Sequence, residues 1–242
     1  DAIRYGVEHW RRNRGRCMGA IYWQLNDCWP VASWSSIDYF GRWKALHYEA
    51  KRFFAPVLLA AFEEGTNVSF AVSNETLADR MLTIRWRVMD TGFHEYARGK
   101  LPVQCGALSA VKLPALSFAK ALAGDLGHRY LAYELVDENG AVLCKKAVLF
   151  EKPKHFSWKN PKISAVFSEK DGKTAITLSS DTFAKGVCLS FGNADVVLSD
   201  NYFDLTDGGS ITVTVEKIIA GNADMTSLQN SLQICSVYNI AK

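Results

Sequence analysis

The feature that most constrains the fold is a hydrophobic pattern of period two, which runs from residue 57 towards the end of the chain. It is clearest at residues 82–88 (LTIRWRV), where apolar residues alternate with threonine and arginine. Because successive side chains of a strand point to opposite faces, the pattern predicts strands with one face in a core and one in water. Similar runs occur at 57–62, 67–73, 95–103, 107–113, 129–136 and 142–150. These short strands predict an antiparallel, immunoglobulin-like β-sandwich over residues 57–152, with Trp86 in its core.

A second series of strand-like runs follows a polar linker between Pro153 and Pro161. It predicts another, C-terminal immunoglobulin-like sandwich over residues 153–242, with strands at 163–168, 173–179, 184–191, 211–217 and 231–240. The stretch LSDNYFDL, residues 198–205, interrupts this series with a tight polar turn. We expect the side chains of Asp200 and Asn201 to bond to the backbone of that turn rather than to a ligand.

The first 56 residues follow a different pattern. Ile3, Val7 and Trp10 recur at helical spacing and predict a helix over residues 2–12, and a second helix is predicted over residues 43–54. Between them Met18–Leu25 is a continuous apolar run of strand length, typical of a strand covered on both faces. Helix, buried strand, loop and helix make one step of a parallel α/β arrangement, but a lone parallel strand has no ladder partner. We therefore expect residues 1–56 to be a piece of a larger domain, and the chain to be part of a longer protein.

Composition narrows the functional classes. The 242 residues are 48% apolar and carry a net charge of +3, which is enough for sizeable cores but gives no argument for nucleic acid or membrane partners. No apolar segment approaches the ~20 residues of a membrane span. The six cysteines are scattered without metal-ligand spacing, so thiols in a reducing compartment are favoured and we expect a cytoplasmic location.

The stretch GAIYWQLNDCWP, residues 19–30, is the candidate site. Aromatic faces pack on the apolar faces of sugar rings, and amide and carboxylate groups bind hydroxyls, so Trp23, Asn26, Asp27 and Trp29 suit a carbohydrate subsite. Alternatively, Trp29 fills space between a barrel and a sandwich, and Asp27 caps its own loop through backbone N–H groups. The residues alone leave both interpretations open.

A resemblance favours the first interpretation. Residues 19–57, GAIYWQLNDCWPVASWSSIDYFGRWKALHYEAKRFFAPV, resemble the end of the catalytic (β/α)8 barrel in β-mannosidases of glycoside hydrolase family 2, where it runs on into the C-terminal domains. LSDNYFDL is similar to part of the last immunoglobulin-like domain of the same enzymes. Between residues 60 and 195 the resemblance rests mainly on strand order.

The resemblance implies a parent enzyme that removes terminal non-reducing β-D-mannose with retention, through two glutamates. In the family both glutamates lie on earlier barrel strands, so this chain is expected to hold no catalytic residue and to be inactive alone. Trp23 resembles the tryptophan that floors the sugar subsite, and a cis peptide bond is expected after it. The expected partners are the rest of the barrel and a β-mannoside oligosaccharide, with no metal, cofactor, nucleic acid or membrane.

The predicted fold is therefore mainly β: two immunoglobulin-like antiparallel sandwiches, preceded by the last helix–strand–helix portion of a (β/α)8 barrel. Three alternatives to the β-mannosidase assignment remain. The sandwiches are carbohydrate-binding modules, or they are purely structural, or the parent is another exo-β-glycosidase of the family, acting on glucosaminides or galactosides.

Overall fold

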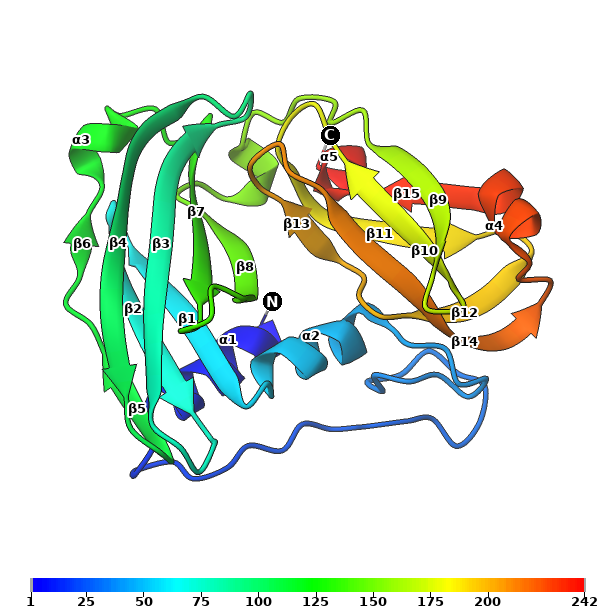
Figure 1. Cartoon of the computed structure of the whole chain (residues 1–242), viewed down its shortest axis with the longest axis horizontal. Helices are drawn as coiled ribbons and strands as arrows, with labels where there is room; N and C mark the ends of the chain where they lie inside the picture. Colours follow the sequence, from blue (N-terminus) through cyan, green and yellow to red (C-terminus); the bar gives the residue numbers. More distant parts are fainter. Residues whose placement is uncertain (1, 242) are drawn as a thin grey trace. The chain divides into compact units, whose positions relative to one another are not determined.

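The computed structural model describes residues 2–241, and the chain divides into two compact units. The first unit contains residues 1–21 and 50–158, and the second contains residues 22–49 and 159–242. Figure 1 shows that strands are the predominant regular element of the chain, as the alternating pattern predicts. Each unit holds its own apolar core.

The first unit is a sandwich of two antiparallel sheets. One sheet has the order β1-β2-β5, with β6 also paired to β2, and the other has the order β4-β3-β7-β8. Its strands are β1 (Val57–Glu64), β2 (Asn67–Asn74), β3 (Arg80–Asp90), β4 (Glu95–Cys105), β5 (Ser109–Lys112), β6 (Leu116–Ser117), β7 (Arg129–Val136) and β8 (Val142–Leu149). Residues such as Phe70, Ile84 and Leu135 are fully buried between the sheets, so the predicted strands and core are confirmed.

Trp86 packs against this core, as predicted. The residue opposite it on the neighbouring strand leaves space for the indole ring. Its partner on β4 is Gly99, and a Cβ atom there would lie 2.3 Å from the indole ring. The ring of Phe118 meets the indole edge to face, with 5.1 Å between centroids. A glycine opposite a tryptophan thus makes room for the larger ring.

Helix α1 (Ala2–Arg11) packs on the first sandwich through buried charges. Glu8, whose side chain has no exposed surface, accepts from Arg4 Nη1 at 3.0 Å and from Lys146 Nζ on β8 at 3.1 Å. Arg11 donates to the carbonyls of Phe53 and Ala55, each at 2.7 Å. The unit also contains the short helix α3 (Ala119–Leu122) and the 3-10 turn η1 (Pro153–His155).

The second unit holds another pair of antiparallel sheets, with strand orders β12-β14-β10-β9 and β13-β11-β15. Ile176, Val187 and Val213 are fully buried in its core. Its elements are β9 (Ser164–Lys170), β10 (Lys173–Ser179), β11 (Ala184–Phe191), β12 (Ala194–Leu198), β13 (Phe203–Leu205), β14 (Ile211–Gly221), α4 (Met225–Ser231), β15 (Leu232–Cys235) and α5 (Val237–Ile240).

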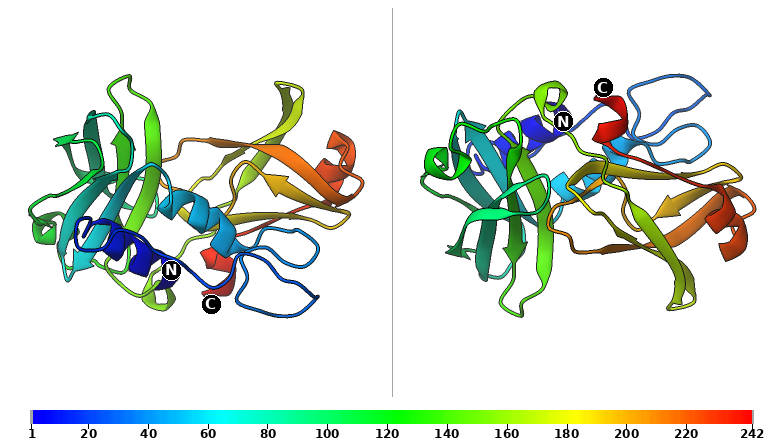
Figure 2. Two further views of the ribbon diagram at one scale, coloured as in Figure 1. Left: turned by 90° about the horizontal axis from the view of Figure 1, so that it is seen from below. Right: turned by 90° about the horizontal axis from the view of Figure 1, so that it is seen from above.

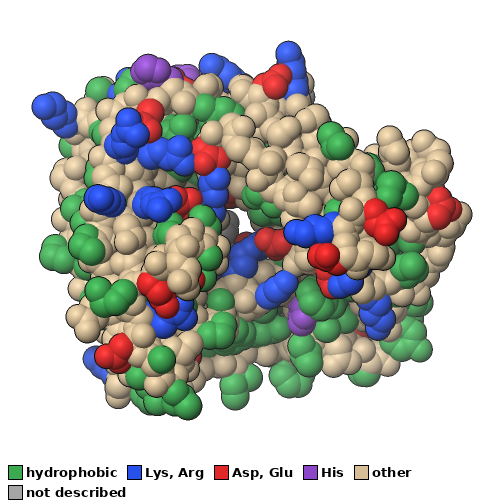
Figure 3. Space-filling view, viewed as in Figure 1, with side chains coloured by type: hydrophobic (Ala, Val, Ile, Leu, Met, Phe, Trp, Pro, Cys, Tyr) green, Lys and Arg blue, Asp and Glu red, His purple; other side chains and the backbone are tan. Residues whose placement is uncertain are grey.

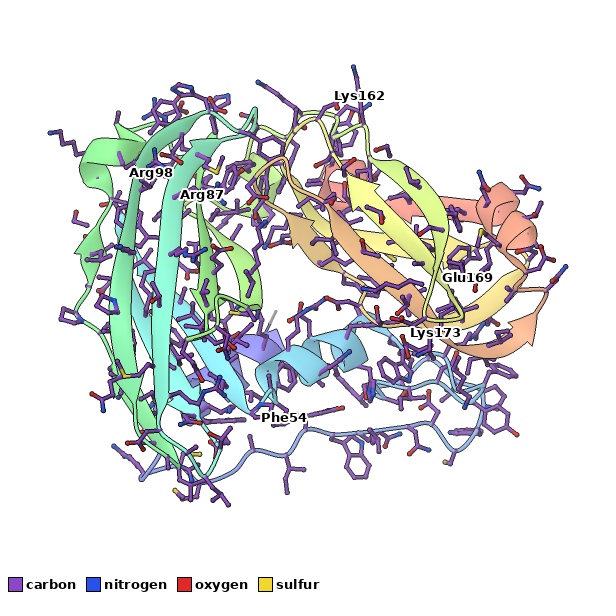
Figure 4. All side chains as sticks on the ribbon, viewed as in Figure 1. Phe54, Arg87, Arg98, Lys162, Glu169 and Lys173 are labelled. Atoms are coloured by element: carbon purple, nitrogen blue, oxygen red, sulfur yellow. The ribbon has the colours of Figure 1, made fainter. Side chains whose placement is uncertain are left out.

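The hairpin of β9 and β10 shows how local sequence sets strand register. Its two-residue turn is Asp171–Gly172, and both residues have a positive φ, as a type I′ turn requires. Glu169 and Lys173 flank this turn (Figure 4). The predicted strand 173–179 coincides with β10.

The prediction of a strand over residues 231–240 is only partly right. Leu232–Cys235 is β15, but Val237–Ile240 is the helix α5. Ser236 explains the change, because its N–H donates to Asn239 Oδ1 at 2.8 Å in a capping box that starts the helix. The prediction also omitted β6, β12, β13, α3 and α4, which are short or lack clear alternation.

The prediction of a buried strand over Met18–Leu25 is wrong for this chain. Residues 17–25 form no strand, and the Ile21 side chain is 96% exposed. Figure 2 shows the segment as an irregular trace in both views. A parallel strand needs neighbours for its backbone groups, and no strand within residues 2–241 pairs with this run. The helices on either side are formed as predicted, as α1 and α2 (Ala45–Phe53).

Candidate functional site

Residues 22–44 form a loop that is closed by its own backbone. Asn26 pairs with Ile37 as a parallel bridge, and Ile37 pairs with Trp43 as an antiparallel one. The Asp27 N–H donates to the Ile37 carbonyl at 3.1 Å, and the Ile37 N–H donates to the Leu25 carbonyl at 2.8 Å. Although the loop has no regular strand, these bonds join residues 25–27 to Ile37 and so hold the two ends of the loop together.

Asp27 is the polar centre of this loop and is buried. Its carboxylate accepts hydrogen bonds from Ser33 Oγ, from Ser35 Oγ at 2.7 Å and from Lys44 Nζ at 3.3 Å. Lys44 Nζ also donates to Ser35 Oγ at 2.7 Å. The carboxylate therefore joins the two ends of the loop through side-chain donors, whereas the structural alternative drawn from the sequence was a cap through backbone N–H groups.

The same contacts set the charge of the Asp27 carboxyl. The hydrogen bonds from Ser33 and Ser35 hold its pKa below the usual value, against the opposing effect of burial, and Lys44 adds to the lowering. Asp27 is therefore ionised at neutral pH. A carboxylate held in this way is poorly suited to donate a proton as a general acid.

The other predicted site residues are exposed: Trp23 is 76% exposed and Trp29 64%, and Asn26 is also exposed. Trp34, which is not a predicted site residue, is 79% exposed. In Figure 3 hydrophobic side chains gather along the lower rim of the view, where Figure 1 draws residues 17–44 in blue. The peptide bond between Trp23 and Gln24 is cis, as the resemblance predicts. The loop thus combines a polar inner frame with an aromatic outer surface.

Helix α2 fixes the end of the loop within the second unit. Tyr48 is buried, and its hydroxyl accepts from the Leu198 N–H at 3.2 Å. Its ring packs on Trp43, with centroids 5.3 Å apart, and on Tyr202, with centroids 5.8 Å apart. Arg42 adds an ion pair to Asp195 on β12 at 3.6 Å. The loop is therefore held by the C-terminal sandwich.

His47 has a structural environment. Its Nδ1 lies 3.0 Å from Ser36 Oγ, and its ring meets Trp43 with 4.3 Å between centroids. Burial lowers the pKa of this imidazole, so it is neutral near pH 7. Among residues 2–241 no group of three histidine, cysteine or carboxylate side chains is placed to hold a metal ion. None of the helices in the described part of the chain has the length and apolar character of a membrane span.

Sequence reasoning singled out Asp27 but missed the residues that bind it. Ser33, Ser35 and Lys44 lie six, eight and seventeen residues further on, so no fixed spacing reveals them. The one available signal is the serine-rich stretch SWSS at residues 33–36, since hydroxyls are common partners of a buried carboxylate.

Two protein-family models match this chain. Residues 66–155 match the Mannosidase Ig/CBM-like domain, and residues 158–240 match an Ig-fold domain of the mannosidases. Each model matches most of one predicted sandwich, and strand β1 lies outside the first match.

Curated relatives extend the match to most of the chain. A β-mannosidase of Capra hircus is 29% identical over 225 residues, which are 86% of this chain and 25% of that protein. A β-mannosidase of Mus musculus is 55% identical over 62 residues, which are 25% of this chain and 7% of that protein. The chain thus spans about a quarter of the length of its first relative.

Solved structures show the same fold. A β-D-mannosidase of Dictyoglomus thermophilum matches 97% of this chain and 28% of its own, with a TM-score of 0.78 and 22% identity. An exo-chitosanase of Amycolatopsis orientalis matches 97% of this chain and 32% of its own, with a TM-score of 0.70 and 17% identity.

Proposed function

We propose that the parent of this chain is a retaining exo-β-mannosidase. The premise is that the chain is similar to the C-terminal region of the β-mannosidases of glycoside hydrolase family 2. The parent hydrolyses terminal non-reducing β-D-mannose. Residues 1–56 belong to its catalytic barrel, and residues 57–152 and 153–242 are its two immunoglobulin-like domains. The observation that carries the proposal is the match of a β-mannosidase of Capra hircus to 86% of the chain.

Within this enzyme the loop of residues 22–44 supplies part of the pocket wall. Trp23 offers an aromatic face to the sugar ring, and Asn26 and Trp29 line the same wall. Asp27 contributes mainly by holding the loop, because Ser33, Ser35 and Lys44 already use its oxygens. The exposure of Trp23, Asn26 and Trp29 in this chain supports a role towards a ligand or the rest of the barrel.

The catalytic pair belongs to another part of the parent. A retaining glycosidase uses two carboxyl groups about 5–5.5 Å apart. The loop has two carboxylates, Asp27 and Asp38, and each is tied into the loop; Asp38 accepts the N–H groups of Phe40 and Arg42 at 2.9 Å each. Two carboxyl groups suffice for the reaction, so the proposal calls for no metal or organic cofactor.

The first test is hydrolysis of an aryl β-D-mannoside by this chain, assayed beside the full-length parent. We expect turnover by the parent and none above buffer by the chain, because neither loop carboxylate is free to act as nucleophile or acid. Parallel assays use the corresponding β-D-glucosaminide and β-D-galactoside. Faster turnover of the glucosaminide or the galactoside by the parent would reject the mannose assignment. Turnover by the chain alone would reject the claim that the catalytic pair lies in another part of the parent.

A second test addresses Trp23 in the parent. Trp23→Ala is expected to lower kcat/KM for the aryl mannoside by about 10- to 100-fold, because a sugar ring loses its stacking partner. Trp34→Ala is the matched control, since Trp34 is equally exposed but lies outside the predicted subsite. We expect that control to change kcat/KM by less than about threefold. Equal losses in the two variants would show that the aromatic surface acts in packing and not at the subsite.

A further inference from the structure

Two cysteines face each other across neighbouring strands of the second unit. Cys188 on β11 and Cys235 on β15 are direct partners in the antiparallel register, and both are free thiols. No other two of the six cysteines are register partners in the strands of residues 2–241. Neither the packing of the core nor the proposed reaction requires two cysteines at these positions.

Both side chains lie on the same face of their sheet. Val187 and Leu189 on β11 are buried in the core of the second unit, and Ile234 on β15 packs against that core. Because side chains alternate along a strand, Cys188 and Cys235 both point to the opposite, outer face. Cys235 is exposed there and Cys188 is half-buried.

The backbone bonds fix the spacing of the pair. Gly192 N–H donates to the Ser231 carbonyl, and in an antiparallel ladder hydrogen-bonded pairs recur every second residue, which includes Cys188–Cys235. Leu189, the next residue on β11, belongs to a pair without these bonds. Its N–H and its carbonyl both bond to the Asn201 side chain instead. A hydrogen-bonded pair has Cα atoms about 5.5 Å apart, within the roughly 4.4–6.8 Å range of disulfides.

We propose that Cys188 and Cys235 are a thiol oxidation site that closes reversibly into a cross-strand disulfide by exchange with a small-molecule disulfide such as glutathione disulfide. A thiolate of the pair attacks one sulfur of the oxidant, forming a mixed disulfide and releasing one thiolate. The second cysteine, deprotonated, attacks the protein sulfur of the mixed disulfide and releases the other thiolate. The protein loses two hydrogens, and the oxidant is reduced to two thiols.

Exposure decides which cysteine reacts first. Cys235 is open to solvent, so an incoming disulfide reaches its sulfur directly. Burial raises the pKa of the Cys188 thiol, partly offset by a hydrogen bond from the Tyr202 hydroxyl. Cys188 therefore acts as the resolving cysteine, protected until Cys235 carries the oxidant.

The test is oxidation of the folded chain with glutathione disulfide, followed by alkylation of the remaining thiols and peptide mapping. We expect a linked Cys188–Cys235 peptide, two fewer free thiols and full reversal by dithiothreitol. The link closes a loop of about 48 residues, so it is expected to raise the melting temperature by on the order of 10 °C. Failure to form this link in the folded chain would overturn the proposal.

Variants test the order of the steps and the role of the fold. Cys188→Ser should stop at a mixed disulfide between Cys235 and glutathione, whereas Cys235→Ser should leave Cys188 largely unmodified. Cys28→Ser removes another exposed thiol and should leave the link intact. A linked peptide formed equally fast in urea would show that the fold does not direct the pairing. None of these measurements depends on glycosidase activity.

Discussion

Replacing Glu8 with alanine is expected to lower the free energy of unfolding of the first unit by about 3–5 kcal/mol. The Glu8 side chain is fully buried and bonds to Arg4 and to Lys146 on β8. Its removal leaves two cations of low exposure without their shared carboxylate, and the cost of an unpaired buried charge exceeds the loss of the ion pair itself. Urea denaturation followed by tryptophan fluorescence measures the change.

Two variants separate buried charge from other effects of the Glu8 substitution. Glu8→Leu combined with Lys146→Met removes the unpaired ammonium and is expected to recover at least half of the loss. Arg85→Ala breaks the more exposed pair with Glu134 and is expected to cost less than about 1 kcal/mol. A Glu8→Ala effect as small as that of Arg85→Ala would contradict the burial argument.

Asn201→Ala is expected to destabilise the second unit by about 2–4 kcal/mol. Asn201 is buried; its Oδ1 accepts from the Leu189 N–H at 2.9 Å and its Nδ2 donates to the Leu189 carbonyl at 3.0 Å. It thereby bonds to β11 beyond the short strand β13, which pairs only as far as Val187. Alanine would leave the Leu189 N–H without its acceptor and the Leu189 carbonyl with only a weak contact from Cys188 Sγ at 3.9 Å.

Thermal unfolding with far-ultraviolet circular dichroism measures the Asn201 effect. The matched control is Asn222→Ala, because Asn222 is exposed and accepts from a single backbone N–H, that of Asp224. We expect that control to cost less than about 1 kcal/mol. Similar melting temperatures for the two variants would show that water replaces the Asn201 side chain at little cost.

The sequence predicted the parts of the fold whose pattern is local. The apolar runs located β7, β10 and β11 at their observed bounds, because each strand contributes side chains to a core. The turn bonds expected of Asp200 and Asn201 are confirmed, since such side chains bond to nearby backbone. The hydrogen bond from the Asn201 side chain to Leu189 is not local, because it depends on the position of Asn201 beside strand β11. No sequence pattern indicates it.

Predictions failed where a segment depends on distant partners. Met18–Leu25 has the composition of a buried strand, but composition does not supply the neighbouring strands that would bury it. The candidate site was predicted from its aromatic and amide residues, whereas the bonds that fix Asp27 involve Ser35 and Lys44, whose role appears only when the loop closes. Which of the predicted site residues contact sugar stays a prediction.

The division of the chain has a consequence for its synthesis. Residues 22–49 belong to the second unit, yet the rest of that unit starts at residue 159, about 110 residues later. At roughly 5–20 residues per second, the aromatic loop and Tyr48 wait on the order of 10 s on the ribosome before Leu198 and Tyr202 are made. During this interval the first sandwich can already fold, while Tyr48 still lacks the partners that bury it. Tyr48 is therefore made early but reaches the partners that bury it only about 150 residues later.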